Sequence, residues 1–275
     1  MKQHLPGVSK RQHEIMDTLR QHGAVAVDPL ADALKVTPQT IRRDLNSLFD
    51  AGFIQRVHGG AVLKDSVENL GYGARKILMV EEKNAIARSV AELIPDHASL
   101  FINIGTTTEQ VARYLTDKAG LLVVTNNMNV ASVLWPVPTI QVMVASGMIR
   151  HSDGGIVGSS TEKFIEQFKV DYAVIGCSAI DSDGEVLDYD VREVCVAKAI
   201  IQHARSVILV ADSMKFKRNA SIRICNLSDI DFLVTDSKVS EQSIRMCESR
   251  EVNLRVVSTP DAQLPDAYRE YRNVG

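Results

Sequence analysis

The stretch that decides the fold of the N-terminal region is Thr37-Pro-Gln-Thr-Ile-Arg-Arg-Asp-Leu-Asn46. Thr37 offers a side-chain oxygen to the free N–H groups of a first helical turn. Pro38 suits the first helical position, because its missing N–H is not needed there. The apolar residues that follow recur at helical spacing, as Ile41, Leu45 and Leu48. The pattern predicts a helix that begins directly after Thr37.

The remaining faces of this helix are polar and suit contact with DNA. Hydroxyl, amide and guanidinium groups donate to phosphates and base edges when a recognition helix lies in the major groove. The predicted DNA-binding residues on this helix are Thr37, Gln39, Thr40, Arg42, Arg43 and Asn46. An ordinary solvated amphipathic helix with two arginines would show the same pattern.

Two more helices are predicted ahead of this one. Ser9 and Gln12 have the spacing of a capping box at the start of the first helix. Asp28-Pro29 begins the second helix after a short extended piece at 25–27, and Lys35-Val36 leaves room only for a tight connection to Thr37. This arrangement is typical of a helix-turn-helix.

A β-hairpin is predicted behind the recognition helix. Two short apolar runs, 53–57 and 61–63, flank His58-Gly59-Gly60, which is typical of a hairpin turn. Three helices followed by a hairpin make a winged helix-turn-helix, predicted here over residues 1–64. On the wing, Arg56 and His58 are expected to contact phosphates or the minor groove. A winged helix that binds protein instead of DNA is the main alternative.

Charge is divided unevenly along the 275 residues. Residues 1–64 carry nine of the 31 Lys and Arg and six of the 34 Asp and Glu, a balance of +3, so the remainder carries −6. Four of the seven histidines also lie in this first quarter. A small basic module attached to a larger acidic one favours a polyanion-binding head on a soluble body.

The cysteines and the apolar runs indicate the compartment. Cys177, Cys195, Cys225 and Cys247 are far apart and show no metal-ligand spacing, so buried free thiols are expected, with neither a metal nor another cofactor. No run approaches the ~18 apolar residues of a membrane span, and no signal-peptide pattern opens the chain. A cytoplasmic protein without membrane contact is expected.

A polar stretch at 65–78 is interpreted as a linker. Beyond it, the sequence pattern predicts helices that alternate with strands. This pattern predicts an α/β domain at 79–258, followed by a tail at 259–275. Val- and Ile-rich strands that alternate with helices form a mainly parallel sheet covered on both faces, and ligands bind beyond the carboxyl ends of such strands. The predicted strands are 100–102, 121–125, 140–144, 172–175, 207–210, 232–234 and 254–257.

The chemistry predicted at those strand ends is phosphate binding. Gly105-Thr-Thr-Thr108 lies between a strand and a helix, where backbone N–H groups and the helix dipole favour an anion. The stretch is neither a P-loop nor a dinucleotide-binding motif, so nucleotides are not indicated. A glycine-threonine turn that only caps the helix is the alternative.

Three other polar clusters have structural interpretations beside functional ones. Asp181-Ser-Asp-Gly184 is typical of a turn. Asp190 and Glu193 fit a capped, solvated helix start. Lys215-Phe-Lys-Arg218 could close over a phosphate or form a solvated basic loop.

Taken together, these motifs resemble the DeoR family of transcriptional repressors. The resemblance covers nearly all of residues 10–235 in the family's order. It is carried by Pro38–Asn46, His58-Gly-Gly-Ala61, Leu100-Phe-Ile102, Ile104-Gly-Thr-Thr107, Val124-Thr-Asn-Asn127, Asp153-Gly-Gly-Ile156, Ile180-Asp-Ser-Asp-Gly184, Lys215-Phe216 and Arg218-Asn-Ala220.

The resemblance implies a DNA-binding domain followed by a sensor similar in fold to ribose-5-phosphate isomerase. Such a repressor of carbohydrate or glycerol metabolism genes is expected to bind double-stranded operator DNA as a homodimer or homotetramer. A phosphorylated sugar or polyol would release it, with glycerol 3-phosphate the first choice and another sugar phosphate the second. By the same match, the effector-binding residues are Gly105, Thr106, Thr107, Asn126, Asn127, Gly147, Asp181 and Lys215.

Some positions depart from the family pattern. Asn103 stands where many members have Asp, Lys217 replaces a usual glycine, and 188–193 follows the pattern only in part. The alternative of a different class is a sugar-phosphate isomerase with an accessory DNA-binding domain, for which Asp188, Glu193 or Lys215 could act as the base. A third interpretation is a constitutive DNA-binding scaffold without an effector.

Overall fold

Thr37 caps helix α3 (Pro38–Asp50) as the sequence predicts. In the computed structural model, which describes residues 9–22, 24–51, 53–57, 59–63 and 72–259, the Thr37 hydroxyl accepts the Thr40 N–H at 3.3 Å, and Pro38 takes the first helical position. Ile41, Leu45 and Leu48 are buried. The predicted start of the helix and its apolar face are confirmed.

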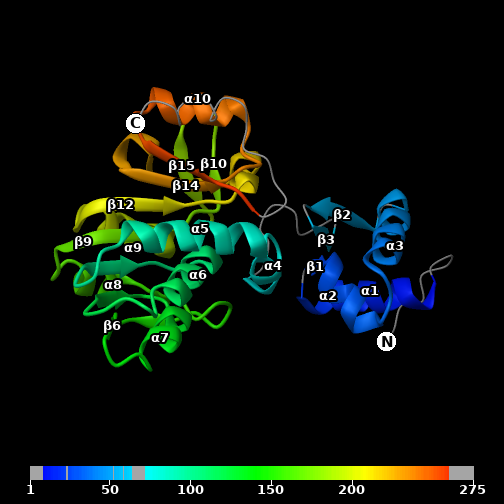
Figure 1. The fold of residues 1–275 in the computed structure, drawn as a ribbon, viewed down its shortest axis with the longest axis horizontal. Coiled ribbons are helices and arrows are strands. Elements are labelled where there is room, and N and C mark those ends of the chain that lie inside the picture. The colour runs from blue at the N-terminus through cyan, green and yellow to red at the C-terminus, as the bar shows by residue number, and fades with distance from the viewer. Residues whose placement is uncertain (1–8, 23, 52, 58, 64–71, 260–275) are drawn as a thin grey trace. The chain divides into compact units, whose positions relative to one another are not determined.

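The elements around α3 form a winged helix-turn-helix (Figure 1). Ser9 and Gln12 form the predicted capping box, with bonds of 2.9 and 3.2 Å. The wing strands pair antiparallel, and a short strand before the second helix joins them in the order β1-β3-β2. The elements are α1 (Lys10–His22), β1 (Ala24–Ala26), α2 (Val27–Leu34), β2 (Ile54–Val57) and β3 (Gly60–Leu63).

The core of the winged helix-turn-helix joins α1, α2 and α3 to the sheet. Ile15 and Leu19 of α1 pack with Leu30 of α2, the buried face of α3 and Ile54 of β2. Lys35 takes a left-handed conformation, φ 53°, which makes the predicted tight turn between α2 and α3. The orientation of α3 is therefore fixed by packing along its whole apolar face.

The chain divides into two compact units, Met1–Val80 and Glu81–Gly275. Of the expected linker 65–78, residues 65–71 lie outside the described residues, and α4 (Tyr72–Ile77) occupies most of the rest, so that part is helical rather than irregular. The expected tail 259–275 lies outside the described residues except for Thr259.

The second unit is built on a seven-stranded parallel sheet, in the order β15-β14-β12-β9-β4-β5-β6. All seven predicted strands are present, because each is a Val-, Ile- or Leu-rich run between turn residues. They are β4 (Ser99–Ile102), β5 (Leu122–Thr125), β6 (Gln141–Val144), β9 (Val170–Ile175), β12 (Ala204–Val210), β14 (Phe232–Asp236) and β15 (Asn253–Val257).

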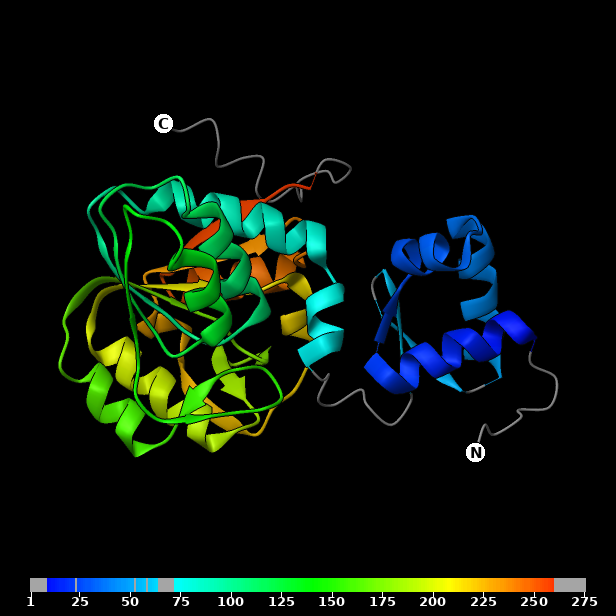
Figure 2. The same ribbon diagram turned by 90° about the horizontal axis from the view of Figure 1, so that it is seen from below.

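Helices cover both faces of this sheet (Figures 1 and 2). On β4, Leu100 and Ile102 pack with α5, α6 and α7, whereas Phe101 between them packs with α8 and α9. This alternation is what a parallel sheet buried on both faces requires. The helices are α5 (Val80–Leu93), α6 (Thr106–Tyr114), α7 (Met128–Leu134), α8 (Ser159–Ile165), α9 (Val191–Gln202) and α10 (Glu241–Ser249).

Smaller elements beside the sheet were not predicted from the sequence. Strands β7 (Met148–Ile149) and β8 (Ile156–Val157) form a hairpin, and β10 (Ala179–Ile180), β11 (Glu185–Asp188) and β13 (Ile222–Asn226) form a separate antiparallel sheet. These strands are short and lack a clear alternating pattern. The described part of the unit also contains the 3-10 helices η2 (Ser213–Lys217) and η3 (Leu227–Asp229). No helix among the described residues is long and apolar enough to cross a membrane.

Gly60 is required by the close approach of β3 to β1. A Cβ at this position would lie 1.9 Å from the Val25 carbonyl oxygen, which is backbone and cannot move aside. We expect Gly60→Ala to destabilise the first unit by at least about 3 kcal/mol. Hydrogen exchange of peptides from β1 and β3 in the full chain would measure the change as lost protection.

Gly59 provides the matched control. It has φ +77°, but nothing lies within 4 Å of a Cβ built there. Asn tolerates this left-handed conformation, so Gly59→Asn should cost less than about 1 kcal/mol. Equal loss of protection in both variants would contradict the close-approach explanation.

Candidate functional site

The order of the strands reverses between β4 and β9. From β4 the chain proceeds outward through β5 to β6, and it then returns to β9 on the other side of β4. Ligands of open α/β sheets bind beyond the carboxyl ends of the strands at such a switch point. The two loops that meet here follow β4 and β9, and a Cβ on Gly176 would lie 3.7 Å from the Ile104 carbonyl oxygen.

The loop after β4 presents the first turn of α6 at this point. Gly105 has φ +152°, a conformation that favours glycine, and no side chain caps the helix. Thr106 and Thr107 follow it in the first turn, whereas the Thr108 hydroxyl donates to Asn103 O at 2.8 Å and Gly105 O at 2.7 Å. Thr108 therefore holds the loop, and the turn's backbone N–H groups donate to no N-cap side chain.

Asn126 and Asn127 follow β5 and have different environments. The Asn127 amide caps α7, accepting from Asn129 N at 2.9 Å, and donates to Glu109 at 3.3 Å. Asn126 is fully buried and donates to Ile156 O at 3.1 Å, while its side-chain oxygen has no hydrogen-bond partner among the described residues. An unpaired buried oxygen is costly, so Asn126 offers an acceptor to a donor supplied from elsewhere.

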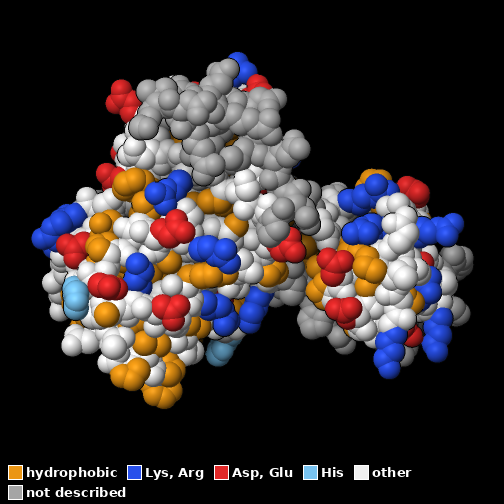
Figure 3. All heavy atoms as spheres, viewed as in Figure 1, with side chains coloured by type: hydrophobic (Ala, Val, Ile, Leu, Met, Phe, Trp, Pro, Cys, Tyr) orange, Lys and Arg blue, Asp and Glu red, His pale blue; other side chains and the backbone are white. Residues whose placement is uncertain are grey.

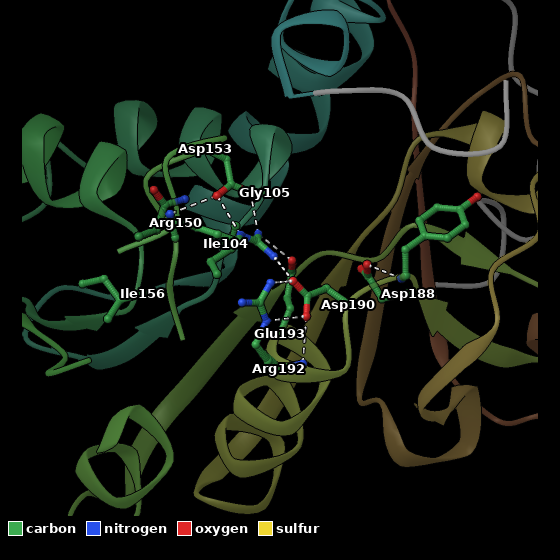
Figure 4. Close-up of polar contacts among 12 residues, drawn as sticks. Ile104, Gly105, Arg150, Asp153, Ile156, Asp188, Asp190, Arg192 and Glu193 are labelled. Atoms are coloured by element: carbon green, nitrogen blue, oxygen red, sulfur yellow. Dashed lines mark hydrogen bonds and ion pairs between the residues drawn. The ribbon is translucent and has the colours of Figure 1, made fainter. Parts of the chain in front are cut away.

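An unpredicted ion-pair cluster lies beside this loop (Figure 4). The Arg150 guanidinium contacts Asp153 at 2.5 Å, Glu193 at 2.7 Å and Asp190 at 3.0 Å, and only 15 % of its side chain is exposed. We call these four residues the Arg150 cluster. They join the β7–β8 hairpin to the first turn of α9.

Protonation in the Arg150 cluster follows from these contacts. Burial opposes the charge on Arg150, but hydrogen bonds and charge from Asp153 and Glu193 outweigh it and raise its pKa. The hydrogen bond from Arg192 holds the pKa of Asp190 well below its usual range, against partial burial and with a further contribution from Arg150. Arg150 and Asp190 are therefore both charged near neutral pH.

The Arg150 cluster is packed against the Gly105 loop. A Cβ on Gly155 would lie 2.5 Å from Ile104 Cδ1, so the hairpin approaches the residue before Gly105 as closely as glycine allows. Asn129 of α7 connects the hairpin to α6, because it donates to Asp153 O at 2.8 Å and to the Glu109 carboxylate at 3.1 Å. The loop after β4, the residues after β5 and the hairpin form one connected polar region.

Lys215 lies at the carboxyl end of β12, in η2, and is 8 % exposed. Burial raises the pKa of the nearby Cys177 thiol to about 12; Lys215 and Arg218 oppose that rise, whereas Asp188 and Asp212 add to it. The residues after β9 and β12 thus form a second polar region. All four cysteines are free, and no group of three or more metal-ligating side chains lies in the described part of the chain.

The two other predicted effector residues have evident structural roles. A Cβ on Gly147 would lie 2.2 Å from Thr161 Oγ1, so this glycine permits close packing beyond β6. The Asp181 carboxylate accepts from Asp183 N and Glu185 N, each at 2.9 Å, and so fixes the turn between β10 and β11. The turn predicted at 181–184 is confirmed.

On the first unit, the predicted DNA-binding side chains are mostly open to solvent. Gln39, Arg42, Arg43 and Asn46 are exposed on α3, and Thr40 is partly buried beside Thr37. Arg56 is exposed on β2 and stacks over the Phe49 ring at 4.5 Å, which joins the wing to α3. His58 lies outside the described residues.

Sequence reasoning missed several residues of this site. Glu109, Arg150, Asp153 and Phe49 were not singled out, although Asp153-Gly-Gly-Ile156 was noted as a motif. The partners of Arg150 lie up to 43 residues away, and no local pattern signals such a pair. The predicted helix cap at Asp190 is confirmed, since Asp190 accepts from Arg192 N at 2.9 Å, but Glu193 is buried rather than solvated and the arginine that both share was not expected.

Comparison with known proteins identifies both units. The profile of the DeoR-like helix-turn-helix domain matches residues 11–67, and that of the DeoR C-terminal sensor domain matches 78–237. The chain belongs to the DeoR family.

The DeoR-family relatives include repressors of known regulons. The glycerol-3-phosphate regulon repressor of Escherichia coli is 44 % identical over 83 % of this chain and 91 % of its own length. That of Haemophilus influenzae is 47 % identical, over 82 % and 89 %. The repressor CsqR of E. coli is 40 % identical, over 82 % and 87 %. This DeoR-family chain is accordingly a transcription regulator and not an enzyme.

The fold expected for a DeoR-family protein is confirmed in its helix-turn-helix and its parallel α/β sensor. A solved D-ribose-5-phosphate isomerase aligns with 49 % of the chain and 52 % of its own, at 16 % identity and a TM-score of 0.37. This similarity is too remote to bear on activity. The alternative of an isomerase with an accessory domain is therefore wrong, since the close relatives are repressors.

The Arg150 cluster yields a stability prediction. Arg150→Met would leave three carboxylates close together without their shared cation, and we expect a loss of about 3 kcal/mol at pH 7. Because the folded-state pKa of Asp190 is lowered, its stabilising contribution is present above the unfolded pKa and is lost as pH falls through the folded value. The difference between wild type and variant should therefore stay constant from pH 7 to about pH 4 and shrink as the pH falls further toward the lowered pKa of Asp190.

Urea denaturation at several pH values measures this difference. Arg192→Met is the control, because Arg192 is half exposed and contacts Asp190 alone in the Arg150 cluster. Arg192→Met should lower the free energy of unfolding at pH 7 by less than Arg150→Met does. A constant loss for Arg150→Met across the pH range would rule out charge neutralisation as its role.

Proposed function

We propose that this chain represses genes of carbohydrate or glycerol metabolism and is released from its operator by a phosphorylated sugar or polyol. In this proposal residues 1–64 bind DNA, 65–78 connect, 79–258 sense the effector in the cytoplasm, and 259–275 form a tail. The proposed DNA-binding residues at α3 are Thr37, Gln39, Thr40, Arg42, Arg43 and Asn46, with Arg56 and His58 on the wing. The effector lies at the carboxyl edge of the seven-stranded sheet.

The first turn of α6 supports an anionic effector most directly. It lies at the switch point of the sheet, follows a glycine and has no side-chain cap. Backbone N–H groups and the helix dipole favour a phosphate at such a terminus, and the Thr106 and Thr107 hydroxyls add donors.

Glycerol 3-phosphate is the first choice of effector, and another sugar phosphate is the second. Two of the relatives are named for the glycerol-3-phosphate regulon, and they match more than four fifths of this chain. The effector would carry hydroxyl groups, and the unpartnered Asn126 oxygen supplies a buried acceptor for one of them. Lys215 would provide the cation, and Asn127, Gly147 and Asp181 would complete the effector-binding residues.

Release follows if the effector favours a state that binds the operator less well. The two equilibria are then coupled by one free energy, which acts equally on both ligands. Helix-turn-helix proteins that read two half-sites do so as symmetric pairs, so the active species is at least a dimer. The chain would act as a homodimer or homotetramer.

Arg42 and Arg43 test the DNA-binding surface separately. If the arginine binds a phosphate, its replacement in Arg42→Ala or Arg43→Ala should weaken binding to all sequences and flatten the salt slope by about one unit. If it binds a base edge, the replacement should instead cost about 1–3 kcal/mol at one operator position. Gel-shift titration over a series of salt concentrations distinguishes these cases.

Arg245→Ala is the matched control for these DNA variants. Arg245 is exposed on α10 of the sensor and forms an ion pair there with Glu241. Its replacement should leave operator affinity unchanged. Unchanged affinity in both α3 variants would show that α3 is not the recognition helix.

Lys215 and Lys217 form a matched pair for the effector site. Both belong to η2, but Lys215 is buried and Lys217 is exposed. Lys215→Met should weaken glycerol 3-phosphate binding about ten- to a hundredfold, because it removes a charge-assisted hydrogen bond, and Lys217→Met should change it little.

Calorimetry with glycerol 3-phosphate and a panel of sugar phosphates measures these affinities in the full chain. If another sugar phosphate binds and glycerol 3-phosphate does not, the second choice of effector is the right one. No binding of any compound, in a protein that still shifts operator DNA, would favour the constitutive scaffold instead.

A further inference from the structure

Strand β6 is an open edge of the seven-stranded sheet. It pairs along one side with β5, and no strand among the described residues pairs with its other side. Gln141 N and Ala145 N donate to the carbonyl oxygens of Leu121 and Thr125, both at 2.9 Å. Because alternate residues of a strand bond to opposite sides, the N–H and C=O groups of Val142 and Val144 face away from β5.

The side chains around this edge are apolar and exposed. Met143 and Val144 are 39 % and 40 % exposed on β6, and Met148 and Ile149 of β7 are 60 % and 50 % exposed. Trp135, which closes α7 beside β6, is 72 % exposed. We call these five residues the β6 patch. Figure 3 shows hydrophobic side chains gathered on the lower part of the larger unit, where Figure 1 draws β6 and α7.

The opposite edge of the same sheet is protected in the usual way. Strand β15 carries Arg255, whose guanidinium donates to Ser89 O and lies 3.8 Å from a Glu92 oxygen. Charged residues on edge strands prevent pairing with other chains. The β6 patch and the whole of Gln141–Val144 hold no charged residue. Of the two edges of the sheet, the β6 edge lacks protecting charges and the β15 edge has them. This difference indicates that the β6 edge is normally covered by another surface.

We propose that β6 pairs antiparallel with β6 of a second copy of this chain about a two-fold axis. Val142 then lies opposite Val144 of the second copy, and Met143 lies at the axis, so the outward backbone groups of both strands are satisfied. This proposal rests on the proposed function only in requiring at least a dimer, and it names the surface that forms it.

A second copy fits this edge better than a partner of another kind. An uncharged patch meets itself across a two-fold axis without repulsion, whereas nothing in it would attract an acidic or basic partner. Trp and Met are the residue types enriched where interfaces are buried. The pairing is continuous with the sheet, so the contact would extend the parallel sheets of two sensors into one.

Sedimentation velocity of the full chain over a range of concentrations tests this surface. Val144→Lys should raise the dimer dissociation constant by about a hundredfold or more, because each two-fold contact would bury two unpaired charges. Met148→Lys is a second variant outside the central strand, with the same expected direction. Val191→Lys is the control, since Val191 is 57 % exposed on α9 and outside the β6 patch.

The outcomes separate this proposal from the proposed function. The β6 contact would be supported if wild type and Val191→Lys are dimers while Val144→Lys or Met148→Lys is a folded monomer. If both β6-patch variants stay dimeric with an unchanged melting temperature, the contact is wrong, although a dimer through another surface stands. A monomeric wild type that binds operator DNA would overturn both the contact and the requirement for a dimer.

Discussion

The reversal of strand order between β4 and β9 is the constraint on which the sensor depends. It brings the loop after β4 and the loop after β9 together at one edge, because the chain leaves these neighbouring strands in opposite directions. The first turn of α6, which has no side-chain cap, then lies at this switch point. The asparagines after β5 extend this region on one side, and the 3-10 helix that carries Lys215 extends it on the other.

Charge neutralisation explains how an acidic sensor could hold the proposed anion site at this edge. Glu109, Asp153, Asp190 and Glu193 all lie near the Gly105 loop, and carboxylates alone would repel a phosphate. Arg150 pairs with three of them and is held there by the same contacts that raise its pKa. Because Ile149 of the β6 patch precedes Arg150 directly, the proposed dimer contact and the Arg150 cluster share one short hairpin. A movement of that hairpin would therefore change both the proposed dimer contact and the Arg150 cluster.

Local patterns predicted much of this structure, whereas contacts between distant residues could not be predicted. The cap at Thr37, the capping box at Ser9 and the seven sheet strands follow from spacing within a few residues, so the sequence shows them directly. The Gly105 loop was predictable for the same reason. The Arg150 cluster and the Arg56–Phe49 stack join residues from different elements, and their pairing depends on the fold. The turn at Asp181 was likewise predictable from local sequence. Its effector-binding role was inferred from the family motif alone and stays a prediction.

The central claim is that effector and operator each weaken the binding of the other through one coupling free energy. The most direct measurement is calorimetric titration of glycerol 3-phosphate into the full chain, free and saturated with operator DNA, beside operator titrations with and without the effector. The account predicts that operator weakens effector binding by the same factor by which effector weakens operator binding, typically about 5- to 150-fold. Equal effector affinity for the free and the operator-bound protein would contradict it.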